Sequence, residues 1–320
     1  MKKNLLGIDI GGTKCAISYG IDTDGILEIA DKVRFDTTDV EATLSGIISR
    51  LGEMCRKHGL DPENTEGVGI SCGGPLSSRE GVIMSPPNLP GWDNVPIVKM
   101  VREATGMKAG LQNDANACAL AEWKYGAGRG TRNMVFLTFG TGLGAGLILD
   151  GKLYSGTNDN AGELGHVRLS DWGPVGYGKA GSVEGFASGG GIAQLASIAV
   201  KEQMMMGRKV PWCPDGDLAG ITAKTVAEAA TSGDILAKEI FRTSATYLGK
   251  ALAMVIDIIN PEVIVIGSIF VRAEELIRPF MQAAIERDAL AAAAAVCTVR
   301  PAELGETIGD VAALSIASSL

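Results

Sequence analysis

Two glycine turns, each lying between two apolar segments, constrain the fold of this chain more than any other feature. The first strand, turn and strand unit spans residues 4–20 and turns at Gly11 and Gly12, and the second spans residues 133–149 and turns at residues 140–142. The two copies share their architecture but not their sequence. Apolar runs joined by glycine predict β-hairpins. We therefore expect two α/β lobes that begin in the same way.

The length and composition agree with two globular lobes. The 320 residues are about twice the usual size of one domain, which favours two lobes around a central cleft. A net charge of −8 argues against a nucleic-acid or anionic-membrane partner, because either would need a basic surface. Scattered cysteines, a start without a signal peptide and no apolar stretch of membrane-spanning length predict a cytoplasmic protein.

Apolar periodicity and chain breakers predict alternating helices and strands in the rest of the chain. Helices are expected at 40–58, 97–105, 115–125, 222–230, 233–259, 271–288 and 309–318. Further strands are expected at 26–35, 67–71, 108–112, 263–266 and 296–300, and glycine-rich loops at 72–96 and 155–191. The expected lobes are residues 1–115, to which a closing helix at 306–320 returns, and residues 116–305.

The first turn offers groups that bind phosphate and a divalent cation. Glycine lets backbone N–H groups approach an oxyanion closely, a threonine hydroxyl can donate a hydrogen bond, and a carboxylate can hold Mg²⁺ directly or through water. Taken alone, the same residues also suit an ordinary hairpin turn. The candidate phosphate ligands are Asp9, Gly11, Gly12, Thr13 and Lys14, with Asp9 as the Mg²⁺ ligand.

The second turn repeats this chemistry, so two turns can clamp a polyphosphate. No helix follows its glycines, which argues against a dinucleotide-binding motif. Its candidate phosphate ligands are Thr138, Gly140, Thr141 and Gly142.

Two further groups of polar residues are candidates for substrate binding. Asn113 and Asp114 lie where a predicted strand meets a predicted helix, so Asp114 either caps the helix or accepts a proton from an attacking hydroxyl. Glu163, His166 and Glu184 lie in glycine-rich segments and suit a neutral polyol. Taken singly, Glu163 could instead be a surface acid, His166 a loop histidine or metal ligand, and Glu184 a helix cap.

In this order the motifs resemble those of the ROK family of sugar kinases and sugar-responsive repressors, over nearly the whole chain. The resemblance rests on DIGGTK (9–14), PPNLPGW (86–92), QNDANACALAE (112–122), the segment 138–156, AGELGH (161–166), the tract after Glu184 and INPEVIVIG (259–267). It implies an α/β, actin-like ATPase (ribonuclease H-like) fold, ATP and Mg²⁺ as cofactors, a hexose substrate and a homodimer. It makes Asp114 the catalytic base and places adenosine near Gly267. The implied sugar ligands are Gly74, Asn88, Asn113, Asp114, Glu163, His166 and Glu184.

The chain departs from the family pattern in two places. Many members bind zinc through three cysteines and the histidine of the AGE-x-GH motif, but Val175, Tyr177 and Ser182 stand where those cysteines would be. Structural zinc needs four ligands, so we expect no zinc site. Hydrogen bonding and packing around Trp172, Tyr177 and Gly181 are expected to orient His166 instead. The second departure is Ser268, which follows Gly267 where the family often has a second glycine.

The resemblance implies an enzyme that transfers the γ-phosphoryl group of ATP to a hexose hydroxyl, most often O6. Glucose is the first choice of substrate, and N-acetylhexosamines, mannose and fructose are the alternatives. A repressor would carry a DNA-binding domain before the first turn, which here begins at residue 9. A non-catalytic sugar-binding regulator is a third possibility, opposed by the presence of Asp9, Asp114 and both turns.

Overall fold

The computed structural model describes residues 2–320 and divides into two compact units. Unit one consists of the chain up to Arg132 together with residues 146–161 and 303–320, and unit two consists of residues 133–145 and 162–302. The boundary expected at residue 115 therefore lies inside unit one. The closing helix belongs to unit one.

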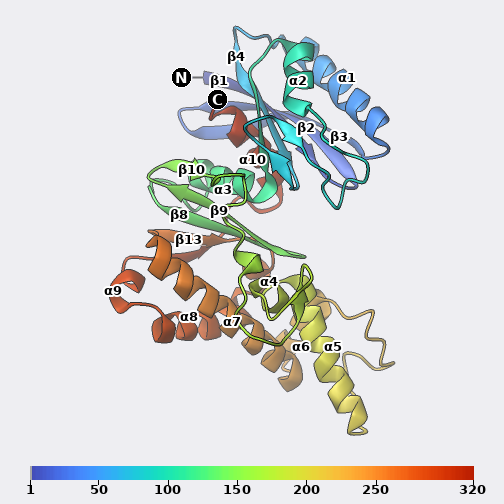
Figure 1. Ribbon diagram of the computed structural model, residues 1–320, viewed down its shortest axis with the longest axis vertical. Helices are drawn as coiled ribbons and strands as arrows, with labels where there is room; N and C mark the ends of the chain where they lie inside the picture. Colours follow the sequence, from blue (N-terminus) through green and yellow to red (C-terminus); the bar gives the residue numbers. More distant parts are fainter. Residues whose placement is uncertain (1) are drawn as a thin grey trace. The chain divides into compact units, whose positions relative to one another are not determined.

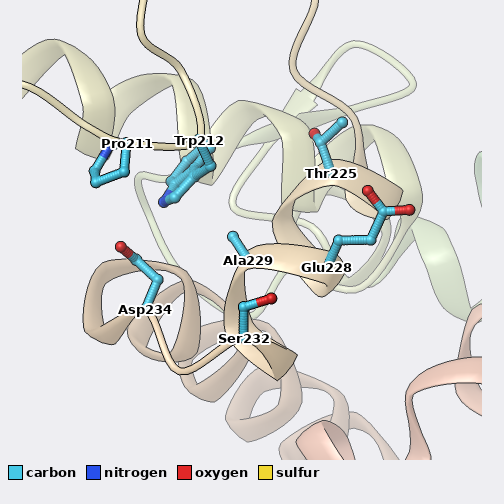
Figure 2. A pocket seen from close by; sticks show the side chains of 7 residues that line it. All are labelled: Pro211, Trp212, Thr225, Glu228, Ala229, Ser232 and Asp234. Carbon is cyan, nitrogen blue, oxygen red and sulfur yellow. The ribbon is translucent and has the colours of Figure 1, made fainter.

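Unit one is built on a five-stranded sheet with the strand order β3-β2-β1-β4-β7. Figure 1 labels β1 to β4 of this sheet. Its strands are β1 (Lys2–Ile10), β2 (Lys14–Thr23), β3 (Ile26–Asp36), β4 (Thr65–Cys72) and β7 (Ala109–Asn113). The first three pair antiparallel, whereas β4 is parallel to both β1 and β7. Asp9 pairs with Ser71, and Ser71 with Gln112. The parallel register thus brings Asp9 and the start of the helix after β7 to the same edge of the sheet.

Helices α1 (Val40–His58) and α2 (Ile97–Thr105) pack against one face of this sheet. Alternate residues of β1, such as Ile8, point into this core because side chains alternate along a strand. The carboxylate of Asp39 accepts the Ala42 N–H at 2.9 Å, and Gly59 ends α1 in the left-handed conformation. These caps explain why α1 has the bounds that the sequence predicts.

Helix α10 (Ile308–Ala317) packs against the other face, together with α3 (Asp114–Tyr125). Gly7, Gly69 and Gly110 lie side by side on β1, β4 and β7 and form a strip beneath α10. A Cβ atom on Gly69 would lie 2.0 Å from the Ala313 carbonyl oxygen. Glycine is therefore needed here for close approach of helix and sheet.

The second sheet has the strand order β10-β9-β8-β13-β14. Its strands are β8 (Met134–Phe139), β9 (Leu143–Leu149), β10 (Lys152–Tyr154), β13 (Val263–Ile266) and β14 (Thr298–Pro301). Strand β13 is fully buried and parallel to β8 and β14, which explains its unbroken apolar sequence. The division between the units falls within β9.

The helices of unit two are α4 (Val183–Phe186), α5 (Gly189–Met205), α6 (Ala223–Thr231), α7 (Ile235–Ile259), α8 (Ile269–Asp288) and α9 (Ala291–Ala294). Short hairpins occur at β5 (Leu76–Ser77) and β6 (Val82–Ile83) in unit one, and at β11 (Val175–Gly176) and β12 (Lys179–Ala180) in unit two. Single 3₁₀ turns occur at η1 (Leu164–His166) and η2 (Gly305–Thr307). Within residues 2–320, no helix has the length and apolarity needed to cross a membrane.

Helix α5 was not expected from the sequence, because it begins with three glycines that are typical of a loop. The Gly189 N–H donates to the Gly140 carbonyl at 2.7 Å, and the Gly190 N–H donates to the Thr141 carbonyl at 3.1 Å. The Ser188 hydroxyl caps the helix through the Gly191 N–H. Tertiary contacts with the second turn therefore supply partners for the first N–H groups of α5.

Candidate active site

The first glycine turn joins β1 to β2 and exposes free hydrogen-bond donors. Its carbonyls are engaged: the Thr37 hydroxyl donates to Gly11 at 2.7 Å, and the Thr37 N–H donates to Thr13 at 2.9 Å. The Gly11 N–H donates to the Lys14 carbonyl. Within the described chain, the N–H groups of Gly12 and Thr13 and the Thr13 hydroxyl make no hydrogen bond, and both residues are exposed. Free N–H groups on a fixed turn suit phosphate oxygens.

Asp9, at the end of β1, is a suitable carboxylate for Mg²⁺. Burial, followed by the negative charges of Asp310 and Asp114, raises the pKa of Asp9 to about 6, while Lys32 and Arg34 act in the opposite direction. Its carboxylate forms no hydrogen bond among residues 2–320. Mg²⁺ binds through one or two carboxylates plus substrate phosphates and water, so Asp9 fits this role. Within residues 2–320, no cluster of three or more His, Cys, Asp or Glu side chains could hold a metal ion.

The first turn of α10 lies beside Asp9, which the sequence did not predict. A Cβ atom on Gly309 would lie 3.2 Å from Asp9 Oδ2. The neighbouring Asp310 is buried, accepts a hydrogen bond from Ser18 Oγ at 2.9 Å and forms an ion pair with Lys32. The closing helix therefore brings an acid from the far end of the sequence to the end of β1.

Asp114 is the first residue of α3, but Asn113 is the residue that caps this helix. Asn113 Oδ1 accepts the Asn116 N–H at 2.7 Å, and Asp114 Oδ1 accepts the Ala115 N–H at 2.8 Å. The alternative in which Asp114 is the cap is therefore wrong. Asp114 is exposed to solvent at the surface of the chain, yet the protein atoms packed around its carboxylate raise its pKa, against the lowering effect of the Ala115 N–H. Such a carboxylate suits a general base.

Asn88 lies between the first turn and the segment after β4. A Cβ atom on Gly12 would lie 2.5 Å from the Asn88 carbonyl oxygen, and one on Gly73 would lie 3.2 Å from Asn88 Oδ1. Leu89 and Trp92 are buried on either side of the loop tip and anchor it in the core. Asn88 therefore lies beside Gly73, whereas a Cβ atom on the predicted ligand Gly74 would have no neighbour within 4 Å.

In unit two, the second turn joins β8 to β9 and is held by hydrogen bonds. The Gly140 N–H donates to the Gly142 carbonyl at 3.1 Å, and Thr138 Oγ1 accepts the Gly144 N–H at 3.0 Å. Thr141 is exposed at the tip. The start of α5 holds the carbonyls of Gly140 and Thr141 through its first N–H groups.

Glu184, predicted to bind substrate, makes direct contact with this second turn. Its Oε2 accepts the Leu143 N–H at 3.0 Å, and a Cβ atom on Gly142 would lie 2.6 Å from the same oxygen. Ser182, and not Glu184, caps the short helix α4 by accepting the Gly185 N–H. One carboxylate oxygen of Glu184 therefore belongs to the turn, and the other makes no hydrogen bond within the described part of the chain.

His166 and Glu163 lie together in unit two. His166 Nε2 is 3.8 Å from Glu163 Oε2, and the His166 ring meets Tyr177 edge-on with 5.1 Å between ring centroids. Lys179 Nζ donates to the His166 carbonyl at 2.7 Å. Tyr177 and Lys179 of the β11–β12 hairpin therefore contact His166 as packing and hydrogen-bonding partners.

The β11–β12 hairpin occupies the place where the family pattern has its cysteines. The Gln194 side chain of α5 bonds both the N–H and the carbonyl of Val175, at 2.9 and 2.8 Å. Gly181 donates to the Pro174 carbonyl at 3.0 Å. The Trp172 side chain is 76% exposed, so it contributes less to this packing than expected.

Gly267 and Ser268 form the turn between β13 and α8. The Gly267 N–H donates to the Leu137 carbonyl at 2.9 Å. Ser268 has φ 60° and ψ −112°, a conformation that glycine adopts readily and other residues rarely do. Its Oγ atom lies 3.5 Å from the ideal Cβ position of Gly140. The backbone here has the conformation of a glycine although the residue is serine.

The two sheets, their glycine hairpins and the helices around them define an actin-like ATPase fold, as predicted. The chain belongs to the ROK family, whose model matches residues 5–319. It is 33% identical over 313 residues to a glucokinase of Halalkalibacterium halodurans, covering 96% of this chain and 92% of that one.

Two solved structures are also similar to the chain. A ROK hexokinase from Thermus thermophilus has a TM-score of 0.80 and 29% identity, covering 100% of this chain and 98% of that one. A ROK family glucokinase from Streptomyces griseus in complex with glucose and AMPPNP has a TM-score of 0.74 and 28% identity, covering 99% of this chain and 100% of that one. The predicted family and fold are therefore confirmed.

Proposed function

We propose that this protein is an ATP-dependent hexose kinase that phosphorylates O6 of glucose or of a related hexose. The observation that carries the proposal is the Asp114 carboxylate, which has a raised pKa and lies at the same sheet edge as Asp9. The glucokinase relatives, one of them bound to glucose and AMPPNP, support this activity and substrate class.

Asp114 acts as the base in the proposed reaction. It accepts the proton of the sugar hydroxyl as that oxygen forms a bond to the γ-phosphorus of ATP, and the bond from this phosphorus to the bridging oxygen of ADP breaks. The free N–H groups of Gly12 and Thr13, together with exposed Lys14, stabilise charge on the phosphoryl oxygens. Mg²⁺ held by Asp9, directly or through water, would supply further charge neutralisation.

The proposal also assigns roles to the other predicted ligands. Because Asn113 Oδ1 is occupied by the helix cap, its amide nitrogen is the group that donates to a sugar hydroxyl. Glu163, His166 and the free oxygen of Glu184 bind other hydroxyls, and the second turn binds phosphate. The nucleotide's adenosine lies against Gly267. We further propose that the protein is cytoplasmic, because all six cysteines are free, as in a reducing compartment. We also propose a homodimer, which light scattering would test.

Asp114→Asn tests the proposed role of the base. General-base catalysis contributes about 10²–10⁴-fold, so we expect kcat to fall by about a thousandfold while the sugar dissociation constant changes little. ADP release is measured across glucose, N-acetylglucosamine, N-acetylmannosamine, mannose and fructose. Asp39→Asn, which makes the same side-chain change at the cap of α1, should keep normal activity.

Near-normal turnover by Asp114→Asn would remove this residue from the role of base. If the unmodified protein turned over none of the five sugars, the kinase proposal would fail, and a non-catalytic sugar-binding regulator would take its place. Sugar binding by calorimetry distinguishes that regulator from a protein that does not recognise hexoses.

A further inference from the structure

Glu122 is a fully buried carboxylate near the end of α3, with 0% of its surface exposed. An acid in the last turn of a helix is electrostatically unfavourable, and a buried carboxylate needs hydrogen-bond partners. Glu122 has three backbone donors: Ala127 at 2.8 Å, Glu303 at 3.1 Å and Leu304 at 3.0 Å. These bonds are the physical reason that a charged group is stable in this place.

The donors come from two segments that are far apart in the sequence. Ala127 lies on the segment through which the chain leaves unit one after α3, and Glu303 is the residue at which the chain returns to it for the second time. The carboxylate also presses on Gly126, where a Cβ atom would lie 2.1 Å from Glu122 Oε2. Glu122 therefore ties both segments to α3.

The segment held at Leu304 leads directly to Asp9. The Leu304 carbonyl accepts the Thr307 N–H and hydroxyl, at 3.2 and 2.7 Å. Helix α10 begins at the next residue, and its second residue, Gly309, lies against the Asp9 carboxylate. Asp114 is the first residue of α3, and Glu122 lies near the end of the same helix. This helix therefore carries the proposed base and, through Glu122, also holds the segment that leads to the Asp9 carboxylate.

Helix α10 has a second attachment to α3 at its opposite end. Lys124 Nζ donates to the hydroxyls of Ser318 and Ser319, at 2.7 and 2.8 Å. These serines lie about 14 Å along the helix from Gly309, at 1.5 Å per residue. Lys124 therefore provides a matched control that loosens α10 far from Asp9.

Resting on the proposed kinase function, we propose that Glu122 is a positioning residue: by holding residues 303 and 304 it sets the first turn of α10, and with it the Asp9 carboxylate, relative to Asp114. Phosphoryl transfer depends on such placement, since a displacement of about 1 Å can lower a rate by about a hundredfold.

The test compares Glu122→Gln with Lys124→Met in the full chain. In Glu122→Gln one of the two acceptor oxygens becomes an NH₂ group, so at least one of the backbone donors loses its acceptor. We measure kcat, the Mg²⁺ concentration at half-maximal rate, sugar affinity by calorimetry without ATP, and hydrogen exchange at residues 303–309, all well below each unfolding temperature.

We expect Glu122→Gln to lower kcat by about ten- to a hundredfold, to raise the Mg²⁺ requirement and to speed exchange at 303–309, with sugar affinity within about twofold. Lys124→Met should keep normal kcat and Mg²⁺ dependence. Normal kinetics in Glu122→Gln, or equal losses in both variants, would overturn the proposal. If Glu122→Gln is insoluble, Glu122→Asp is judged by the same criteria. If the unmodified protein showed no turnover, the kinase function would fail instead. The role of Glu122 would then be judged by hydrogen exchange alone, and unchanged exchange at 303–309 in Glu122→Gln would refute it.

Discussion

Replacing Gly69 by alanine tests the close contact between β4 and α10. The added Cβ atom would lie 2.0 Å from the Ala313 oxygen, 2.6 Å from the Ala317 nitrogen and 2.8 Å from the Ile316 Cβ atom. Two of these three neighbours are backbone atoms of one helix, so no side-chain rotation relieves the clash. The whole helix must move away from the sheet by about 1 Å or more to restore ordinary contact distances.

Overpacking of a core costs about 1–3 kcal/mol, and the distances at Gly69 place this substitution at the upper end. At about 2–4 °C per kcal/mol, a loss of about 3 kcal/mol lowers the unfolding temperature of unit one by about 6–12 °C. The measurement is thermal unfolding by calorimetry.

Gly52→Ala is the matched control, because Gly52 lies within α1 and its added Cβ atom would meet Arg56 Nη1 at 3.4 Å. That neighbour is the mobile end of a side chain. Alanine is the better helix former, so this variant should gain about 0.5–1 kcal/mol. An unfolding temperature of Gly69→Ala within 1 °C of the unmodified protein would refute the argument about helix and sheet contact.

Two other substitutions test the electrostatics and the backbone. Hydrogen bonds, first from His58 and then from Lys57, lower the pKa of Asp31 from its ordinary value of 3.8 to about 2. The ionised Asp31 carboxylate therefore adds stability above about pH 4, and this stability is lost as the pH falls towards 2. Asp31→Asn should therefore be less stable by about 1 kcal/mol at pH 6, after allowance for solvent screening, and urea unfolding at pH 6 and pH 2.5 should show the difference shrink; an equal difference at both values would contradict the assignment. Ser268→Gly should gain about 1 kcal/mol in unfolding free energy by relieving the positive φ, whereas Ser268→Ala, which keeps the Cβ atom, should not; equal effects of the two changes would rule out backbone strain.

Local sequence signals predicted much of the fold. The bounds of α1 follow from its capping residues Asp39 and Gly59. The strand β13 follows from its unbroken apolar run. Helix α5 was missed because the partners of its glycine start are the carbonyls of Gly140 and Thr141, some fifty residues earlier in the chain. A pattern confined to residues 188–205 does not contain that information.

The candidate site shows the same limit. The types of residue in the turns indicated phosphate chemistry, but the proximity of Asp310 and Gly309 to Asp9 depends on how α10 crosses the sheet. Likewise, the contact between Glu184 and Leu143 joins two predicted motifs that are separate in the sequence. Such tertiary partners have no local signal, because they are fixed by packing.

The three-segment construction of unit one has a consequence for synthesis in the cell. The ribosome makes β1 to β7 first, but α10, which covers the glycine strip, is made only after residues 162–302 of unit two. Until then Leu5, Leu27 and Ile29, which pack against Leu314 in the finished protein, lie uncovered on the growing chain. Unit one therefore cannot complete its fold until α10 has been made, and until then its nascent sheet exposes apolar side chains that favour aggregation.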